Sequence, residues 1–469
     1  MSERSSFSIE SALRPDQLNE LFEQVRKYHL LLHPERFQNV RRGAVGGKSA
    51  VAFTVIGPQD GWRLEAEVWV EQGFQFRTER PEGVPEEAVR WLYNDLLAVV
   101  QGIEKDIEKA AITLIWVKGE RIVPEEMPSV MRRTLGRLFS RSLLLLTILL
   151  FTFNIILFIL IGIIAVIFIL LVQLLLIIFA DVLFGALGKW TITPASPQVY
   201  LLQIKVDRKV VDDIKAKKVD LALLKQAVFE SAFAHGEEPS CLVIGETLLR
   251  FGIFCSEENI QVKEINVLEL VKRAAEPFHA PLPKIIISNS LVPNAAASGV
   301  SFRRGVLLLT GGILTALDEE ELISVIGHEL GHLRGRDPLF LYAIVSGEFL
   351  LRVTLLFPLF LFSPILYLII STFAIFFVAK FFEARADLLS VMAIGRPKVL
   401  AESLRKIGAQ RLQAEKTSKL ASWLRFDTHP PLYFRIERLE GMSTPVVVKH
   451  PLLESAKDVI RGFLSAFRA

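Results

Sequence analysis

The sequence contains few cysteines and no long basic stretch. Cys241 and Cys255 are the only cysteines in 469 residues, too few for a disulfide framework or a cysteine-based zinc site. We therefore expect a reducing compartment, with one Cys241–Cys255 disulfide as the alternative. The formal net charge is only +3, so no nucleic-acid partner is expected. The first residues, MSERSSFSIE, lack the apolar segment of a signal peptide, and none is predicted.

Apolar residues are abundant instead. They make up 51% of the chain, while charged residues still make up 22%. A chain of this length is expected to form two or three domains. The mixture predicts soluble domains joined to membrane-spanning helices. We therefore expect an α+β protein that is mainly α-helical and is embedded in a membrane.

Residues 1–130 are predicted to form a soluble N-terminal α+β domain. The stretch WRLEAEVWV (62–70) alternates apolar and polar residues, the pattern of a half-buried strand. KSAVAFTVI and GFQFRTE indicate further strands, and the segment beginning PEEAVRWLYNDLL indicates a helix. This part shows no catalytic constellation. His29 and His33 are four residues apart, but no glutamate follows His29 and Pro34 comes directly after His33, so we expect ordinary packing roles.

The first membrane segment is predicted at 142–180, where 39 residues carry no charged side chain. One helix of that length would extend for roughly 58 Å, about twice the ~30 Å hydrocarbon core of a bilayer. A hairpin of two crossings fits better, with its turn near Gly162. Arginines precede the segment and lysines follow it, which places both ends on the cytoplasmic side. A single long tilted helix is the alternative.

Residues 190–337 are expected to form a cytoplasmic catalytic region. PKIIISNS (283–290) predicts a buried strand, and two extended stretches follow it. Asp318, with Glu321 three residues later, predicts the start of a helix with a capping box.

That helix carries GHELGHLRGRDP (327–338). Residues four apart share a helix face, so His328 and His332 can offer two nitrogens to one tetrahedral zinc. Glu329 is next to His328 and is predicted to be the general base, taking a proton from the attacking water.

The third ligand must come from further along the chain. The metzincin pattern fails because Pro338 stands where its last histidine would be. Glu348 and Glu383 are the downstream glutamates. Glu383 is favoured because FFEARADLLSV places Asp387 one helical turn later, where its carboxylate can accept the ring N–H of a zinc-bound histidine. Glu348 is interpreted as a polar residue within an apolar span.

A second membrane hairpin is predicted at 339–382. If the histidines and Glu383 share a metal, the chain between them must cross the membrane an even number of times. Two spans fit, with Pro358 and Pro364 marking the turn and Glu348 pairing with Arg352. Residues 383–469 would then complete the zinc site and form a C-terminal tail. The expected protein has about four spans in two hairpins, lies in the plasma membrane, and has its soluble parts in the cytoplasm.

HELGHLRGRDP, an apolar hairpin, EARAD and THPPLYFRIERL together resemble a known family. It is the family of membrane-bound zinc metallopeptidases that includes the HtpX-like proteases and the CaaX prenyl proteases. The resemblance extends over roughly 140–440 and implies a gluzincin-type catalytic domain with a small sheet. It also implies one Zn²⁺ per chain and polypeptide substrates, including damaged membrane proteins.

The resemblance also assigns roles to individual residues. It implies that Glu383 is the third zinc ligand, with Asp387 as its partner. His429, in the H-P-x-x-x-x-R motif, would steady the oxyanion of the tetrahedral intermediate, and Arg435 would brace the site. Asn294 and Ala295 would begin an edge strand that pairs with an extended peptide substrate. In addition, Asp337 falls where the family usually has an aspartate.

The resemblance is closest to the HtpX-like branch, although about 130 additional residues precede the first apolar segment here. Two other functions are weighed: a zinc-binding but inactive membrane scaffold, and a membrane-tethered adaptor without zinc. The intact Glu329 favours the enzyme. The sequence makes no prediction of the oligomeric state.

Overall fold

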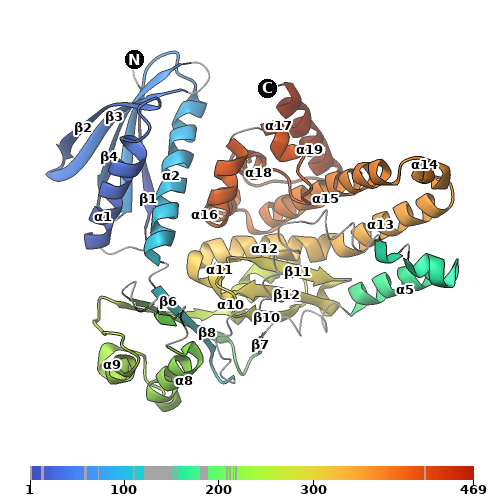
Figure 1. The fold of residues 1–469 in the computed structure, drawn as a ribbon, viewed down its shortest axis with the longest axis horizontal. Helices are drawn as coiled ribbons and strands as arrows, with labels where there is room; N and C mark the ends of the chain where they lie inside the picture. Colours follow the sequence, from blue (N-terminus) through green and yellow to red (C-terminus); the bar gives the residue numbers. More distant parts are fainter. Residues whose placement is uncertain are drawn as a thin grey trace. The chain divides into compact units, whose positions relative to one another are not determined.

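The computed structural model describes residues 3–11, 15–57, 61–71, 73–108, 111–120, 152–154, 156–179, 189–206, 210, 213–214, 216, 219–416 and 419–468. The protein divides into two compact units (Figure 1). The first comprises Met1–Ala111 with Gly408–Thr417, and the second comprises the rest of the chain. The fold is a mixture of helices and sheets in which helices predominate, as expected.

The first unit is built on a five-stranded antiparallel sheet. Its order is β1-β5-β4-β3-β2, formed by β1 (Glu3–Glu10), β2 (Phe37–Val45), β3 (Lys48–Ile56), β4 (Arg63–Val70) and β5 (Gly73–Arg80). The predicted alternation is confirmed in β4, where Leu64, Ala66 and Val68 are buried. Helices α1 (Pro15–Val25) and α2 (Glu86–Glu108) share one apolar core with the sheet.

Two details of this unit bear on the sequence predictions. The unit ends at Ala111, earlier than the expected 130, because β6 (Ala111–Val117) joins a sheet of the second unit. His29, just after α1 in the π-helical turn η1 (Arg26–Leu30), forms a 2.6 Å hydrogen bond with Asp95. It belongs to no metal-binding cluster among the described residues.

The second unit contains two smaller sheets. The three-stranded sheet has the order β6-β8-β9, with β8 at Gln198–Lys205 and β9 at Ile260–Asn266. Its apolar core includes residues of α8 (Leu221–Ser231) and α9 (Cys241–Arg250). The four-stranded sheet has the order β11-β12-β10-β7, formed by β7 (Trp190–Ile192), β10 (Lys284–Ser288), β11 (Ala295–Gly299) and β12 (Gly305–Thr310). Strand β10 is the buried strand that the sequence predicted, and β11 is an edge strand antiparallel to β12.

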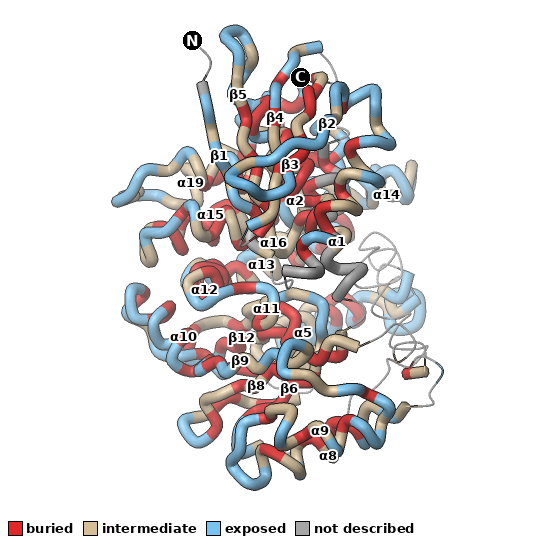
Figure 2. The backbone as a smooth tube through the Cα atoms, turned by 90° about the vertical axis from the view of Figure 1, so that its left-hand side faces the viewer, coloured by how far each residue is buried: buried red, intermediate tan, exposed pale blue. Residues whose placement is uncertain are grey.

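Helix α12 (Glu319–Gly335) lies between this sheet and the long helix α15 (Pro364–Ile394) (Figure 1). It begins at the predicted capping box, in which Asp318 and Glu321 each bind the other's backbone N–H. It ends at Gly335 and is capped by Arg336, which adopts a left-handed conformation. Most of its residues are buried (Figure 2). Other described helices of the unit are α10 (Val267–Ala275), α11 (Gly311–Ala316), α13 (Asp337–Val353), α14 (Phe357–Phe362), α17 (Lys419–Trp423), α18 (Leu432–Glu440) and α19 (Pro451–Arg468). Helix α16 (Pro397–Lys416) begins in this unit, and its residues from Gly408 onward belong to the first.

The apolar segments form helices that only partly test the predicted hairpins. Of the described helices, α15 is the one that has the length and composition to cross a membrane. In the first segment, Thr152–Ile161 and α5 (Ile164–Ile178) flank Gly162, whose φ of +62° interrupts the helix where a turn was expected. Both pieces are shorter than a span, and the ends of 142–180 lie outside the described residues. Four crossings therefore remain a prediction.

The second apolar segment folds back on itself. Helix α13 leads through α14, which contains Pro358, to α15, which begins at Pro364. The turn thus falls where the two prolines placed it. Because α13 and α15 are in contact, both ends of the segment lie near α12.

Cys241 and Cys255 form a disulfide within the second unit. This is the alternative that the sequence had left open. It removes the argument for a reducing compartment, because that argument rested on the two cysteines being unpaired.

Candidate active site

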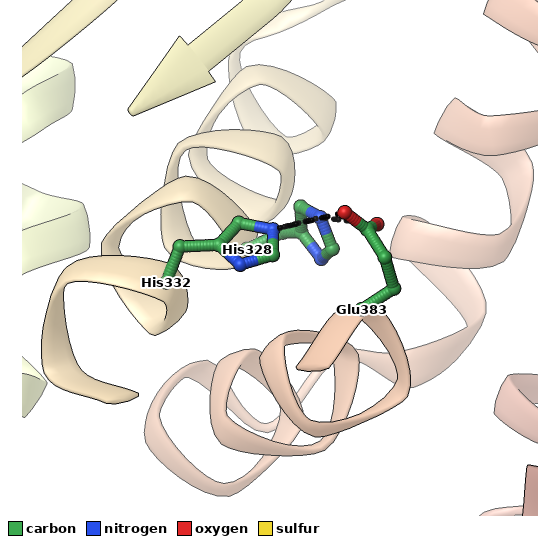
Figure 3. Close-up of side chains that lie close together, drawn as sticks. All are labelled: His328, His332 and Glu383. Carbon is green, nitrogen blue, oxygen red and sulfur yellow. Dashed lines mark hydrogen bonds and ion pairs between the residues drawn. The ribbon is translucent and has the colours of Figure 1, made fainter. Parts of the chain in front are cut away.

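The two motif histidines lie on one face of α12. Their Nε2 atoms are 3.2 Å apart, and the ring planes are nearly perpendicular, at 86°. His328 is buried and His332 nearly so. The helical spacing of four residues therefore brings two ring nitrogens together, as Figure 3 shows.

Glu383 of α15 supplies a carboxylate opposite these nitrogens (Figure 3). Its oxygens lie 3.6 Å from Nε2 of His328 and 3.5 Å from Nε2 of His332. Ligand atoms about 2.0–2.1 Å from a tetrahedral zinc are separated by about 3.3 Å. In addition, the buried Oε2 of Glu383 accepts no hydrogen bond from the described residues. The three side chains therefore fit a zinc ion, and they are the one potential metal cluster in the described part of the chain.

Two further carboxylates contact the Nδ1 atoms of the two histidines. Asp387 Oδ1 lies 2.9 Å from His328 Nδ1, and Asp337 Oδ2 lies 2.7 Å from His332 Nδ1. A proton on each Nδ1 leaves the Nε2 lone pair free for a metal. The contact of Asp387 with a histidine ring was predicted, whereas no contact was predicted for Asp337. The sequence feature that could have identified Asp337 is its position, five residues after His332 and immediately past the end of the helix.

Arg435 of α18 connects the acidic residues of the site. It donates two hydrogen bonds to the Asp387 carboxylate, at 2.9 and 2.7 Å, and its Nη1 lies 3.5 Å from Glu383 Oε2. Burial lowers the pKa of Arg435, but the charges of Asp387 and Glu383 outweigh burial and raise the pKa above its usual range. A permanent cation thus offsets two buried carboxylates.

The two histidines differ in protonation when no metal is bound. Burial lowers the pKa of His328, but the hydrogen bond and charge of Asp387 prevail and raise the pKa to about 9. Burial also lowers the pKa of His332, and there the charge of Glu383 does not reverse the effect. The metal-free site therefore carries one imidazolium and one neutral imidazole at neutral pH.

His429 approaches the cluster from the loop before α18. Its Nε2 lies 3.5 Å from Glu383 Oε1, and its Nδ1 lies 2.9 Å from the Asp427 carboxylate. The side chain is 46% exposed, so this side of the cluster is open to solvent. Lys380 of α15 donates to the backbone carbonyl of Asp427 and fixes the loop. Sequence reasoning found neither Asp427 nor Lys380, because both contacts depend on tertiary folding.

The remaining predicted residues lie as follows. Glu329 is on α12 beside His328 and is buried. Asn294 directly precedes the edge strand β11, which Ala295 begins, and α12 packs against that strand. Glu348 is in α13, where it accepts a hydrogen bond from Tyr367 at 3.0 Å and pairs with Arg352 at 3.4 Å. It is not a member of the metal cluster.

A metal-binding triad of two histidines and a glutamate, with a buried glutamate beside the first histidine, defines a metalloprotease of the HExxH type. Residues 261–443 match the model of "Peptidase family M48". The chain is 28% identical over 229 residues to a "Protease HtpX homolog" of Thermodesulfovibrio yellowstonii, which covers 41% of this chain and 80% of that protein.

Two further proteins of the same name show the same relationship. One from Desulfatibacillum aliphaticivorans is 30% identical over 223 residues, covering 39% of this chain and 72% of the relative. One from Pyrococcus furiosus is 30% identical over 208 residues, covering 37% and 72%. The chain therefore belongs to peptidase family M48 and is an HtpX-like metalloprotease, an enzyme whose substrates are polypeptides.

Proposed function

We propose that the chain is a zinc-dependent endopeptidase in which His328, His332 and Glu383 hold one Zn²⁺. The observation that carries this proposal is the arrangement of the three ligand atoms, 3.2–3.6 Å apart, with both Nδ1 atoms held by carboxylates. A bound zinc would supply Lewis acidity, which polarises the peptide carbonyl and makes water a better nucleophile at neutral pH.

Glu329 is the proposed general base. It is buried beside His328, so bulk water has little access to its carboxylate. It takes a proton from the attacking water and delivers the proton to the amine that leaves. Asp387 and Asp337 hold the two histidine rings, and Arg435 holds Asp387 in turn.

His429 is the proposed oxyanion donor. Its Nδ1 lies 2.9 Å from the Asp427 carboxylate, which holds the ring with Nε2 toward the cluster. On this open side of the cluster, Nε2 would donate a hydrogen bond to the oxygen of the scissile carbonyl. One such donor typically contributes about 3–4 kcal/mol to the transition state.

The substrate is proposed to bind in an extended conformation along β11. This strand has a partner, β12, on one side and is the edge of its sheet on the other. A peptide that adds to a sheet edge is held mainly by backbone hydrogen bonds. The position of Asn294 at the start of β11, with α12 against the strand, supports this site.

The chain is proposed to cross the membrane several times, through hairpins at 142–180 and 339–382. Its catalytic regions would be 190–337 and 383–469. The soluble part before the first hairpin would include the N-terminal unit, which ends at Ala111. The charge distribution supports the cytoplasmic face for the soluble parts. The resemblance supports the plasma membrane and a role in membrane-protein quality control. Glu383 follows the apolar part of α15, which supports a site close to the bilayer.

Replacing Glu329 tests the mechanism. In detergent-purified Glu329→Gln, cleavage of casein and of the chain itself is expected to fall at least 100-fold, because the base is gone while the zinc ligands remain. Bound zinc should stay at one per chain. Glu319→Gln, an exposed position on the same helix, is the control and should cleave like the wild type. Equal cleavage by Glu329→Gln and wild type would refute the assignment of the base.

A further inference from the structure

The C-terminal helix α19 exposes a stripe of large apolar side chains. The exposed fractions are 60% for Leu453, 43% for Ile460, 48% for Leu464 and 69% for Phe467. Their spacings of seven, four and three residues place all four on one helix face. Single exposed apolar residues are common on protein surfaces, but an aligned row along a whole helix indicates a contact surface.

A neighbouring face of α19 is already occupied by protein. Val459 and Ala466 are buried in a cluster with Trp423 and Ala384. Phe463 packs edge-on against Phe377 of α15, with ring centroids 5.3 Å apart. The helix is therefore fixed to the rest of the second unit by one face, and the apolar stripe lies outside that contact.

The contact with α15 sets the height of α19 relative to the predicted bilayer. Phe377 lies six residues before Glu383, or about 9 Å along the helix. The uncharged run of α15 ends at Ala379, four residues before Glu383. Helix α19 therefore lies where the apolar part of α15 gives way to the polar site.

Basic side chains border the stripe. Lys457, Arg461 and Arg468 are exposed and recur at spacings of four and seven residues, forming a row beside the apolar one. The last ten described residues, VIRGFLSAFR (459–468), contain no acidic residue. An apolar stripe flanked by basic residues is typical of helices that lie in the interface of anionic bilayers.

We propose that α19 lies in the headgroup region of an anionic bilayer, with Leu453, Ile460, Leu464 and Phe467 at the acyl boundary. This inference rests on the proposed membrane insertion of α15. Helix α19 is joined to α18 by Arg438, which donates to Asp458 at 2.9 Å and to Ser455 at 3.1 Å. Contact with lipid through α19 would thus hold α18, which carries Arg435, at a fixed distance from the membrane surface.

Spin labels on the full-length protein in nanodiscs test this proposal. One label is attached at a cysteine introduced as Leu464→Cys in the stripe, another at Ser465→Cys on the same helix outside it, and a third at Ile370→Cys in the apolar part of α15. The native cysteines are bonded to each other. The discs contain phosphatidylglycerol, and accessibility to oxygen and to a water-soluble nickel chelate is compared.

The expected result is high oxygen and low nickel accessibility at 464 and at 370, with the reverse at 465. If 370 reports lipid while 464 reports water, the inference about α19 is wrong and membrane insertion stands. If 464 is shielded from both reagents, a protein partner covers the stripe and the inference is likewise wrong. If 370 also reports water, both the membrane insertion and the inference are overturned.

The charge contribution is tested separately. In the triple variant Lys457→Gln, Arg461→Gln, Arg468→Gln, the label at 464 should become several-fold more accessible to the nickel chelate, because the attraction to anionic headgroups is lost. With the basic residues unchanged, discs of pure phosphatidylcholine should give the same increase in accessibility of the label at 464 to the nickel chelate. No change in either case would rule out recognition of anionic lipid.

Discussion

At the scale of single residues, the site depends on charges that are buried in compensating pairs. His328 and His332 each contact a carboxylate through Nδ1, and Asp387 in turn contacts Arg435. A buried carboxylate without partners would be costly. Here every acidic side chain in contact with a ligand histidine has a cation or a ring N–H beside it. The rings of the two proposed ligands are therefore already oriented in the metal-free protein.

The carboxylates behind the histidines should tune zinc affinity. In Asp387→Asn and Asp337→Asn, the affinity is expected to fall about 10–100-fold, because the amide holds the ring less firmly and makes Nε2 less basic. Competition with a chelator of known affinity measures the effect. Asp427→Asn is the matched control: it contacts His429 and should change turnover but not zinc affinity. Unchanged affinity in both of the first two variants would contradict the proposed support.

Zinc binding should release a proton from His328. Its pKa of about 9 in the metal-free protein means that it is protonated at pH 7.5, whereas the pKa of His332 is lowered and that ring is neutral. A metal needs both Nε2 lone pairs, so about one proton must leave per zinc at pH 7.5. Above the pKa of His328 the release should vanish. Calorimetry in buffers of different ionisation enthalpy counts the protons, and a value near zero at pH 7.5 would show that His328 is already neutral.

At the scale of elements, the site exists because α12 and α15 pack closely. Gly331, between the two histidines, faces Ala386, which lies between Glu383 and Asp387. A Cβ at position 331 would lie 2.9 Å from the Ala386 carbonyl oxygen and 3.1 Å from its Cα. The glycine therefore has a structural purpose within the motif, since it lets the helix with the histidines approach the helix with the carboxylates.

Gly331→Ala should therefore separate the two helices. Because the contact is with backbone rather than with a flexible side chain, we expect a loss of about 1–3 kcal/mol of stability and weaker zinc binding. Gly347→Ala in α13 is the control, since a Cβ there meets nothing within 4 Å. It should be neutral or stabilising by up to about 1 kcal/mol. Thermal unfolding in detergent and zinc competition measure both variants, and equal behaviour of the two would refute the close-packing argument.

The elements themselves were largely predictable from local patterns. The alternation in 62–70, the capping residues Asp318 and Glu321, and the prolines of the hairpin turn all correspond to observed features. These signals act over a few residues, so the sequence displays them directly. The contact of Asp337 with His332 was not predicted, because it depends on the left-handed turn at Arg336, which brings the carboxylate back to the histidine ring.

At the scale of the whole molecule, the second apolar segment leaves the site and returns to it. His332 precedes the segment and Glu383 follows it, and their side chains meet at 3.5 Å. Both ends must therefore lie on the same side of any membrane that the segment enters. The tip of the hairpin, where Phe362 is 88% exposed, would then lie on the opposite side.

A cysteine at the tip should reveal the crossing. In proteoliposomes, Phe362→Cys and Lys398→Cys, the latter just after α15, should react with a membrane-impermeant maleimide from opposite sides. Residues 364–382 extend about 28 Å as a helix, close to the ~30 Å of a bilayer core. Labelling of both positions from the same side would show that the hairpin does not cross.

Local patterns in the sequence predict the chemistry of this protein. The HExxH spacing, the downstream EARAD stretch and the apolar segments are local patterns, and they indicated a zinc site, its base and a membrane setting. Only the tertiary structure decided which carboxylate supports which histidine, that Lys380 and Asp427 position the loop of His429, and that Cys241 and Cys255 pair. These contacts join residues whose meeting depends on how helices and loops pack. No local pattern encodes that packing, because it is set by the burial of side chains from the whole unit.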